Sequence, residues 1–436
     1  MSAGGGSGAR AAALAVAQGL AEEIQDAQRP VRILSAIAWG AEVRERFFAA
    51  GARELPRVSY APRFDTRAVA EQFDALARRA RAALEGEPGL GIMVAETCES
   101  YAMAARMLGA VGTRGFYHRS IELYGRPASV ATGGRATNLD LAQHFDAVIQ
   151  RYAGFEVPPE PELLSAEEAA ALLERHLGAF FREGPAAQVA VRCEVVEGLA
   201  AKAASGSGGV RLRAGARFSR RELLQLEHHE GHVHVATTLN GRAHKALPLL
   251  ASSSPRSTRT QEGLAIFTEF LSQTIDVARL RQLSGRILAI KMAEDGADFL
   301  QLYRYFLEQG ATESGAFESA RRVVRGGLVE GGAPFTKDVV YLDGLTRIAG
   351  FLQVAMTRRH PELVAGLFLG KLELDDVPLL SRLCQEGVLV PPRYLPGWAR
   401  DLGFLTAYMS WNAFLDPAAA EGARQHFASV LQRAGD

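Results

Sequence analysis

Apolar residues recur at helical spacing along most of this chain. The clearest case covers residues 66–85, where the apolar positions are Val69, Phe73, Leu76 and Ala80. Arg and Glu residues fill the positions between them. A repeat of three to four residues with charges in between is typical of an amphipathic helix that has one solvated face. The sequence therefore predicts a helix over this stretch.

The same spacing predicts helices in most of the remaining chain. The earlier ones cover residues 10–28, 33–47 and 96–108, and the later ones residues 165–182, 258–275, 287–292, 299–306 and 317–324. Two predicted helices begin with a capping box, in which a Ser is followed three residues later by a Glu. The pairs are Ser165 with Glu168 and Ser219 with Glu222. The second box opens a helix that leads into a cluster of histidines.

Strand patterns are few in this sequence. Residues 188–196 are rich in Val and partly alternate, and residues 210–213 follow a Gly- and Ser-rich stretch. Both are typical of strands and predict a β-hairpin or small sheet before the histidine cluster. Residues 335–341 also look strand-like. The fold class expected is α+β, predominantly helical, with a small β-sheet ahead of the histidine helix.

A proline-rich segment divides the chain. At 436 residues the protein exceeds the size at which one hydrophobic core usually stops growing. Residues 158–162 read Pro-Pro-Glu-Pro-Glu, a stiff polar linker. We therefore expect a flexible Gly-rich tail at residues 1–9, a helical N-terminal lobe at residues 10–160, and a second lobe at residues 161–436.

Charge and cysteine content narrow the class of protein. Lys plus Arg and Asp plus Glu number 49 each, so overall charge gives no support for a nucleic-acid or membrane partner, and we expect neither. The three cysteines, Cys98, Cys193 and Cys384, form no Cys-x-x-Cys pair. A reducing, cytoplasmic location fits them best. The sequence leaves the oligomeric state open.

The strongest chemical signal is a cluster of four histidines among the ten in the chain, at positions 228, 229, 232 and 234. It contains the run His229-Glu230-Gly231-His232-Val233-His234, an H-E-x-x-x-H pattern. This is one residue longer than the H-E-x-x-H of ordinary zinc peptidases.

The extra residue has a geometric consequence. In a regular α-helix, side chains five residues apart point in directions about 140° apart, so His229 and His234 could not easily share a metal. A π-bulge adds one residue to a turn and would bring them together. Gly231, within the motif, lacks a side chain that would resist the distortion. The sequence therefore predicts a π-bulge at this place.

Two other interpretations of the cluster stay open. His228 and His232 have the ordinary four-residue spacing, although no Glu directly follows the first of them. Alternatively, the histidines belong to the polar surface of a helix. In the preferred register, His232 is expected to orient a neighbour or face solvent rather than bind metal.

A catalytic Zn²⁺ ion requires three protein ligands and one open position. His229 and His234 supply two, and the best third candidate is Glu262, 28 residues after His234 at the start of another helix. Glu230 would act as the general base that takes a proton from the attacking water and later passes it to the leaving amine. Glu269, seven residues after Glu262, lies on the same helix face and could orient a ligand histidine.

Other candidate site residues rest on weaker patterns. Lys337 and Tyr341 lie beside a glycine-rich loop that looks mobile, and either could stabilise an oxyanion. Packing explains the tyrosine, and surface exposure the lysine, equally well. Arg242 and His244 follow an Asn-Gly turn signal and could meet the substrate's carbonyl or carboxylate, or simply be solvated.

Three segments together carry a resemblance to a known family. They are His229–His234, the run Thr260-Gln261-Glu262-Gly263-Leu264-Ala265, and residues 332–341 with Phe335-Thr336-Lys337-Asp338 and Tyr341. This set resembles the QEGLA-motif family, a zincin-like group of H-E-x-x-x-H proteins, over most of the chain after about residue 30. Its bacterial members are labelled flavohaemoglobin expression-modulating proteins, and its animal relatives include tyrosine carboxypeptidases acting on α-tubulin.

The resemblance implies zinc on His229, His234 and Glu262, with Glu230 catalytic. It also implies a zincin-like metallopeptidase core. One departure is Ala243-His244, where a Gln is expected after Asn-Gly-Arg.

The sequence therefore predicts a zinc metallocarboxypeptidase that acts on the C-terminus of a peptide or protein and removes one residue, with an aromatic residue as a candidate. The alternative is a non-catalytic metal-binding protein that modulates the expression of other genes. An intact Glu230 favours the enzyme, because a structural zinc site needs no base.

Overall fold

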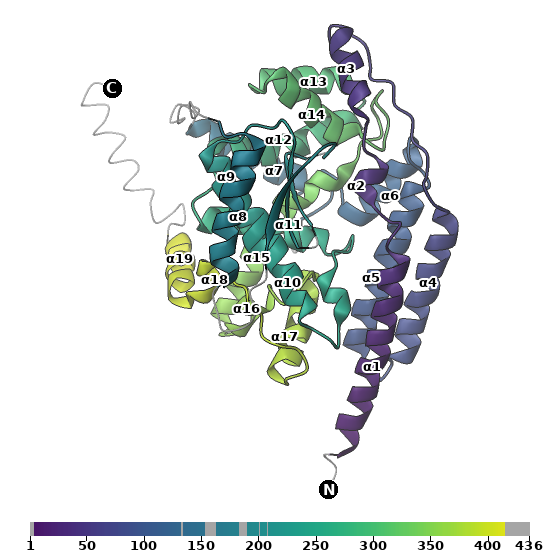
Figure 1. The fold of residues 1–436 in the computed structure, drawn as a ribbon, viewed down its shortest axis with the longest axis vertical. Coiled ribbons are helices and arrows are strands. Elements are labelled where there is room, and N and C mark those ends of the chain that lie inside the picture. The colour runs from purple at the N-terminus through teal and green to yellow at the C-terminus, as the bar shows by residue number, and fades with distance from the viewer. Residues whose placement is uncertain are drawn as a thin grey trace, which may run out of the picture.

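The structure is a computed structural model that describes residues 4–131, 134–152, 163–182, 190–199, 201–206 and 208–414. It is mainly helical, with one three-stranded sheet among the described residues (Figure 1). This confirms the predicted α+β, predominantly helical class.

In the N-terminal third, the regular elements that the structure describes are all helices. Its helices are α1 (Gly4–Ala27), α2 (Ile33–Ala36), α3 (Ala41–Ala49), α4 (Thr66–Ala83), α5 (Pro88–Leu108), α6 (Arg114–Tyr124) and α7 (Asn138–Arg151). Helices α1, α4 and α5 run side by side along one edge of the molecule (Figure 1). Asp65 starts α4 by accepting hydrogen bonds from two backbone N–H groups, and Pro88 starts α5.

Helix α1 begins at Gly4, within the residues predicted as a flexible tail, and the flexibility of that tail stays a prediction. One prediction in this region differs from the structure. The helix predicted over residues 33–47 is two helices, because the chain leaves helical geometry between Ala36 and Ala41. Gly40 at this break has extended backbone and precedes the first turn of α3.

The sheet lies directly before the histidine helix in the sequence. Helix α8 (Ala166–Arg182) is followed by β1 (Arg192–Val196), β2 (Ala203–Ser205) and β3 (Gly209–Arg213). The strand order is β1-β3-β2, with β1 parallel to β3 and β2 antiparallel to it. Of the two forms expected, a hairpin or a small sheet, the structure has the sheet, with β2 as an additional edge strand.

Both predicted capping boxes are present. The Ser165 backbone N–H donates to Glu168, whose own N–H donates to the Ser165 hydroxyl. Ser219 and Glu222 form the same pair at the start of α9. The elements that follow are α9 (Arg220–Leu226), the π-helix η1 (Glu227–Val235), α10 (Ala236–Arg242), the 3₁₀ turn η2 (Pro248–Ala251) and α11 (Thr258–Leu271).

In the rest of the described chain, the regular elements are all helices. Its elements are α12 (Val277–Glu294), α13 (Phe299–Glu308), α14 (Glu313–Val324), η3 (Thr336–Val339), α15 (Val340–Thr357), α16 (Glu362–Gly366), η4 (Leu374–Asp376), α17 (Val377–Gln385), α18 (Gly397–Arg400) and α19 (Leu402–Phe414). The segment Thr336–Thr357 is long and apolar enough to cross a membrane by length and composition, but half of it is buried inside the fold.

Three local predictions in the second half are wrong. Residues 335–341 form η3 and the start of α15, not a strand. The Asn-Gly pair at 240–241 lies inside α10, because the buried Asn240 amide bonds to the backbone of Tyr394 and Phe368 and needs no turn. The glycine-rich segment 326–332 is packed rather than loose: a Cβ on Gly326 would lie 2.4 Å from Phe116.

Helix η1 lies between two hydrophobic cores. Val233 belongs to the largest core, which also contains Phe73 of α4 and Tyr101 of α5. Val235 belongs to a second core beneath the sheet, together with Leu177 of α8. Residues on both sides of the predicted lobe boundary thus share one core. The boundary itself, at residues 160–161, lies outside the described residues, and the division into lobes stays a prediction.

Candidate metal centre

The H-E-x-x-x-H run forms a π-helix, as its spacing predicts. Residues 227–235 have π-helical hydrogen bonding between α9 and α10. The wider turn brings His229 and His234, five residues apart, to a ring-centroid separation of 4.9 Å. A Cβ on Gly231 would lie 2.1 Å from Leu177, so glycine also permits the close approach of α8.

Three side chains from two helices converge beside this turn. Glu262 Oε2 lies 3.5 Å from His229 Nε2 and 3.8 Å from His234 Nε2. These separations are long for hydrogen bonds. They are close to the edge of about 3.4 Å expected between ligand atoms of a tetrahedral zinc site. The residues present therefore fit a zinc ion, although their role as ligands stays a prediction.

Each histidine is oriented through its other ring nitrogen. His229 Nδ1 donates to Glu269 Oε1 at 2.6 Å, the contact that the helix spacing of Glu269 predicts. His234 Nδ1 donates to Gln261 Oε1 at 3.4 Å. With Nδ1 of each ring donating in this way, both Nε2 atoms face Glu262, and each would present its lone pair to a bound metal.

The surrounding charges favour a cation at this place. Burial lowers the pKa of His229, but its contacts with Glu262 and Glu269 outweigh burial and raise the pKa to about 10. Burial raises the pKa of Glu269, but Arg279 and His229 outweigh it and lower the pKa to about 2. Glu269 and Glu262 are therefore both ionised, and Arg279 donates to both oxygens of Glu269.

Glu262 is held in place by the packing of α11 against α15. A Cβ on Gly263 would lie 2.2 Å from the backbone of Gly344, so the two helices touch through a pair of glycines. This contact brings η3, just before α15, to the metal centre. Lys337 Nζ then donates to Glu262 Oε1 at 3.1 Å.

The two weaker candidates lie on the Glu262 side of the centre. Lys337 contacts the candidate ligand itself, which suits a positioning role at least as well as oxyanion stabilisation. The Tyr341 hydroxyl accepts from Arg322 at 3.4 Å, and Lys337 lies 5.3 Å from the Tyr341 ring centre. The catalytic role of each stays a prediction.

Glu230 points to a different neighbour from the histidines, as a general base should. Its Oε2 accepts from the backbone N–H of Ser205 on the edge strand β2 at 2.8 Å. It lies beside His229 in the sequence but does not belong to the three-residue cluster. The β-sheet therefore positions the carboxylate that the sequence assigns to catalysis.

The alternative register also forms a compact group. Glu227, His228 and His232 likewise place possible ligand atoms within 4.8 Å of one another. His228 and His232 contact each other through Nδ1 at 3.0 Å, and Phe180 stacks on His232. In this group the Nδ1 atoms of His228 and His232 bind each other. No carboxylate or amide of the described residues therefore orients either ring through Nδ1. The first group matches a catalytic centre better.

The two candidate residues that follow the π-helix, Arg242 and His244, lie in different surroundings. His244 is buried and donates through Nε2 to the Leu369 carbonyl, so it supports the fold and does not reach a substrate. Arg242 lines the large cleft described next. The turn that was expected to carry both side chains toward a substrate does not form.

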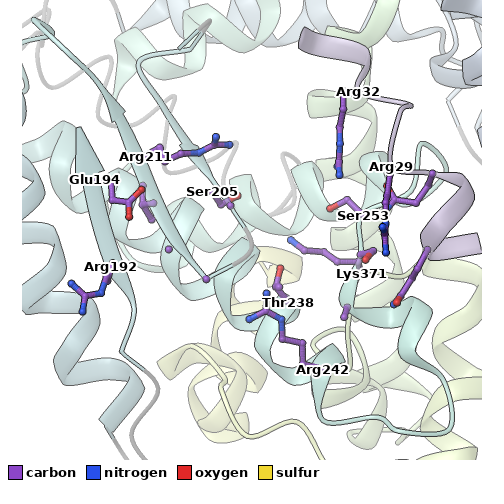
Figure 2. A pocket seen from close by; sticks show the side chains of 18 of the residues that line it. Arg29, Arg32, Arg192, Glu194, Ser205, Arg211, Thr238, Arg242, Ser253 and Lys371 are labelled. Atoms are coloured by element: carbon purple, nitrogen blue, oxygen red, sulfur yellow. The ribbon is translucent and has the colours of Figure 1, made fainter. Parts of the chain in front are cut away.

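A cleft of about 1190 Å³ opens beside the centre (Figure 2). It lies between the end of α1, the sheet and α10, and two of its lining residues adjoin the metal centre. Ser205 is the residue that binds Glu230, and Lys371 Nζ donates to Gln261 Oε1 at 3.0 Å. Burial lowers the pKa of Lys371 to about 7, although Glu230 and Glu262 oppose the shift.

The cleft is strongly cationic. Its lining contains one carboxylate, Glu194, and six cationic side chains, Arg29, Arg32, Arg192, Arg211, Arg242 and Lys371. Figure 2 shows Arg29, Arg32 and Lys371 on one side and the arginines of the sheet on the other. An acidic chain segment lying in this cleft would be attracted electrostatically to its lining along its length.

Sequence reasoning missed Gln261, Lys371 and Ser205. Gln261 had a usable signal, because it precedes Glu262 in the motif and so lies at the same end of α11. Lys371 is 110 residues from Gln261, and Ser205 is 25 residues from Glu230, and no local pattern indicates either contact.

A profile of the family described as microtubule-associated tyrosine carboxypeptidase matches residues 45–416. That range contains every residue of the metal centre and all of the cleft except its α1 side. No curated protein matches the chain at a significant level.

Proposed function

Because the chain belongs to the microtubule-associated tyrosine carboxypeptidase family, we propose that it is a zinc-dependent carboxypeptidase acting on peptides or proteins with an acidic C-terminal segment. The observation that carries the proposal is the convergence of His229, His234 and Glu262, with Glu230 adjacent to His229 in the π-helix. The family description supports the reaction class, and the cationic cleft supports the acidic substrate.

The chain's own residues divide the work of peptide hydrolysis. His229, His234 and Glu262 would hold the metal, which when bound supplies Lewis acidity for the scissile carbonyl and the attacking water. Glu230, fixed by the Ser205 N–H, takes a proton from that water and delivers it to the leaving amine. Glu269 and Gln261 keep both histidines in the tautomer that leaves Nε2 free.

The cleft accounts for the substrate class. An extended peptide spans about 3.3 Å per residue, so a cleft of this size holds several residues upstream of the scissile bond. Acidic side chains on those residues would lie among the arginines. The described cysteines are all free, and we propose a reducing, cytoplasmic location.

The test combines metal analysis with peptide digestion. Purified protein should contain one zinc per chain, and mass spectrometry of a library of acidic peptides should show loss of one C-terminal residue. The variant Glu230→Gln should keep its zinc, because Glu230 is not a ligand, and lose activity by roughly 10²- to 10⁴-fold.

Salt and charge provide a matched control. Raising the ionic strength should reduce cleavage of an acidic peptide and leave a neutral peptide with the same last residue nearly unaffected. Protein without zinc, or identical products from wild type and Glu230→Gln, would contradict the proposal and favour the regulatory alternative.

A further inference from the structure

A second group of cations is connected to the centre through Tyr341 and Lys337. Four arginines, which we call the arginine cluster, come from α12 and from the end of α14, namely Arg286, Arg321, Arg322 and Arg325. Arg321 and Arg325 are four residues apart, so both point to one side of the helix end. None of the four lines the cationic cleft.

The cluster contains more guanidinium groups than carboxylates. Asp338 accepts two hydrogen bonds from Arg322, at 2.7 and 2.8 Å, and lies 3.6 Å from Arg286 Nε. Glu318 pairs with Arg321 and lies 3.9 Å from Arg213. Asp338 and Glu318 thus already lie beside four guanidinium groups, those of Arg322, Arg286, Arg321 and Arg213. Arg325 adds a fifth.

Arg325 is the unbalanced member. It is 3% exposed, and its Nε is fully enclosed without a hydrogen-bond partner. Its guanidinium forms no ion pair or hydrogen bond with any residue in the described ranges. Burial, together with the neighbouring Arg322, lowers the pKa of Arg325 to about 9. A buried cation without a partner is costly, and an anion bound beside it would remove that cost.

Short contacts connect the cluster to the metal centre. Arg322 Nη2 donates to the Tyr341 hydroxyl, Lys337 lies over the Tyr341 ring, and Lys337 binds Glu262. The side chains of Arg322 and Glu262 are 20% and 15% exposed, so both reach solvent. Arg325 lies more deeply buried than either.

This arrangement matches what a carboxypeptidase must recognise. The substrate's α-carboxylate lies one residue beyond the scissile carbonyl, and one residue spans about 3.8 Å. A group that binds it must therefore lie just past the metal ligands. Through the contacts above, Tyr341 and Arg322 follow Lys337 on the Glu262 side of the centre.

We propose that Arg322 and Arg325, with the Tyr341 hydroxyl, form the subsite that binds the α-carboxylate of the substrate's last residue. The inference rests on the proposed function, and it assigns the requirement for a free C-terminus to a specific set of side chains. The bound carboxylate supplies the anion that Asp338 and Glu318 leave missing. The cationic cleft then serves the acidic residues upstream.

The test compares two peptides that differ in one group. An acidic peptide with a free C-terminal carboxylate and its C-terminal amide are titrated into zinc-loaded Glu230→Gln protein by calorimetry. The acid should bind tighter by roughly 10- to 100-fold. Adding Arg325→Met should bring this acid-to-amide ratio close to one, and Arg325→Lys should restore part of it.

The stability of the Arg325 variant distinguishes a role of Arg325 in substrate binding from a structural role. Arg325→Met removes an unpaired buried charge, so the protein should unfold at the same or a higher denaturant concentration. The matched control is Arg347→Met, because Arg347 is buried but paired with Glu373. That variant should lose stability and keep the acid-to-amide ratio.

Other outcomes would overturn the inference. An unchanged ratio in Arg325→Met, or a ratio lost in Lys371→Met instead, would place the carboxylate elsewhere. Binding of inorganic phosphate that depends on Arg325, with equal binding of acid and amide peptides, would make the cluster an anion site unrelated to substrate. Because binding is measured without hydrolysis, a failure of peptidase activity remains a separate result.

Discussion

The two histidines of the candidate centre differ in what holds their second nitrogen. His229 donates to Glu269, a carboxylate paired with Arg279, whereas His234 donates to the neutral Gln261. Gln261 Oε1 also accepts from Thr237 and Lys371, so one amide oxygen connects the metal centre to the cleft. At the scale of single residues, the orientation of the candidate ligands thus depends on groups that are not candidate ligands.

This dependence predicts the behaviour of Gln261→Leu. Without the acceptor, His234 is no longer held in the tautomer that presents Nε2, and the affinity for zinc should fall by about 10- to 100-fold. Competition with a chelator of known affinity measures the change. The control Gln353→Leu makes the same substitution at an exposed position on α15 and should leave the affinity unchanged. Equal affinities for the two variants would refute the role of Gln261.

At the scale of elements, the sequence predicts helices well and their junctions poorly. The two capping boxes and the extra residue of the H-E-x-x-x-H run determine local geometry directly, and both appear as predicted. Residues 335–341 were misassigned because Val339 and Val340 favour strands, whereas the contact of α11 with α15 requires a helix there. Tertiary contacts overrode the local preference.

Helix α15 contains two glycines that differ in the space available for a side chain. A Cβ on Gly344 would lie 2.3 Å from the Arg259 carbonyl oxygen and 3.0 Å from Gly263 Cα, whereas a Cβ on Gly350 would meet nothing within 4 Å. Gly344→Ala should therefore destabilise the protein by about 1–3 kcal/mol through overpacking and displace Glu262. Gly350→Ala should stabilise it by up to about 1 kcal/mol.

Denaturant unfolding of both variants, with zinc affinity measured alongside, checks this pair. Gly344→Ala should also bind zinc more weakly, because the α11–α15 contact places Lys337 against Glu262. Equal midpoints for the two variants would show that the helices can separate without cost.

At the scale of the whole molecule, one core joins regions that the sequence assigns to two lobes. Phe73 and Tyr101 pack in the same core as Val233 of the π-helix. The metal centre also combines a π-helix, the helix α11 and the edge of a small sheet. No single part of the chain contains a complete site and the core that supports it.

A fragment covering residues 161–436 should therefore not fold alone. Removing the N-terminal helices would expose the face of the large core that they cover, and the hydrophobic loss exceeds the stability of a typical domain. Circular dichroism and proteolysis of the fragment test this, with the full chain as control. A fragment that unfolds cooperatively and binds zinc would instead support two independent lobes.

The sequence by itself determined the helical class, the caps and the π-helix, because spacing within one helix sets these features. Its motifs also indicated Glu262 as the partner of His229 and His234, although the packing of α11 brings the three together. The tertiary structure decided the rest. It placed Lys371 on Gln261, Ser205 on Glu230 and Lys337 on Glu262, and within the described ranges it left the Nε of Arg325 without a hydrogen-bond partner. Such contacts join distant residues, and their geometry depends on how whole helices pack, which no local pattern encodes.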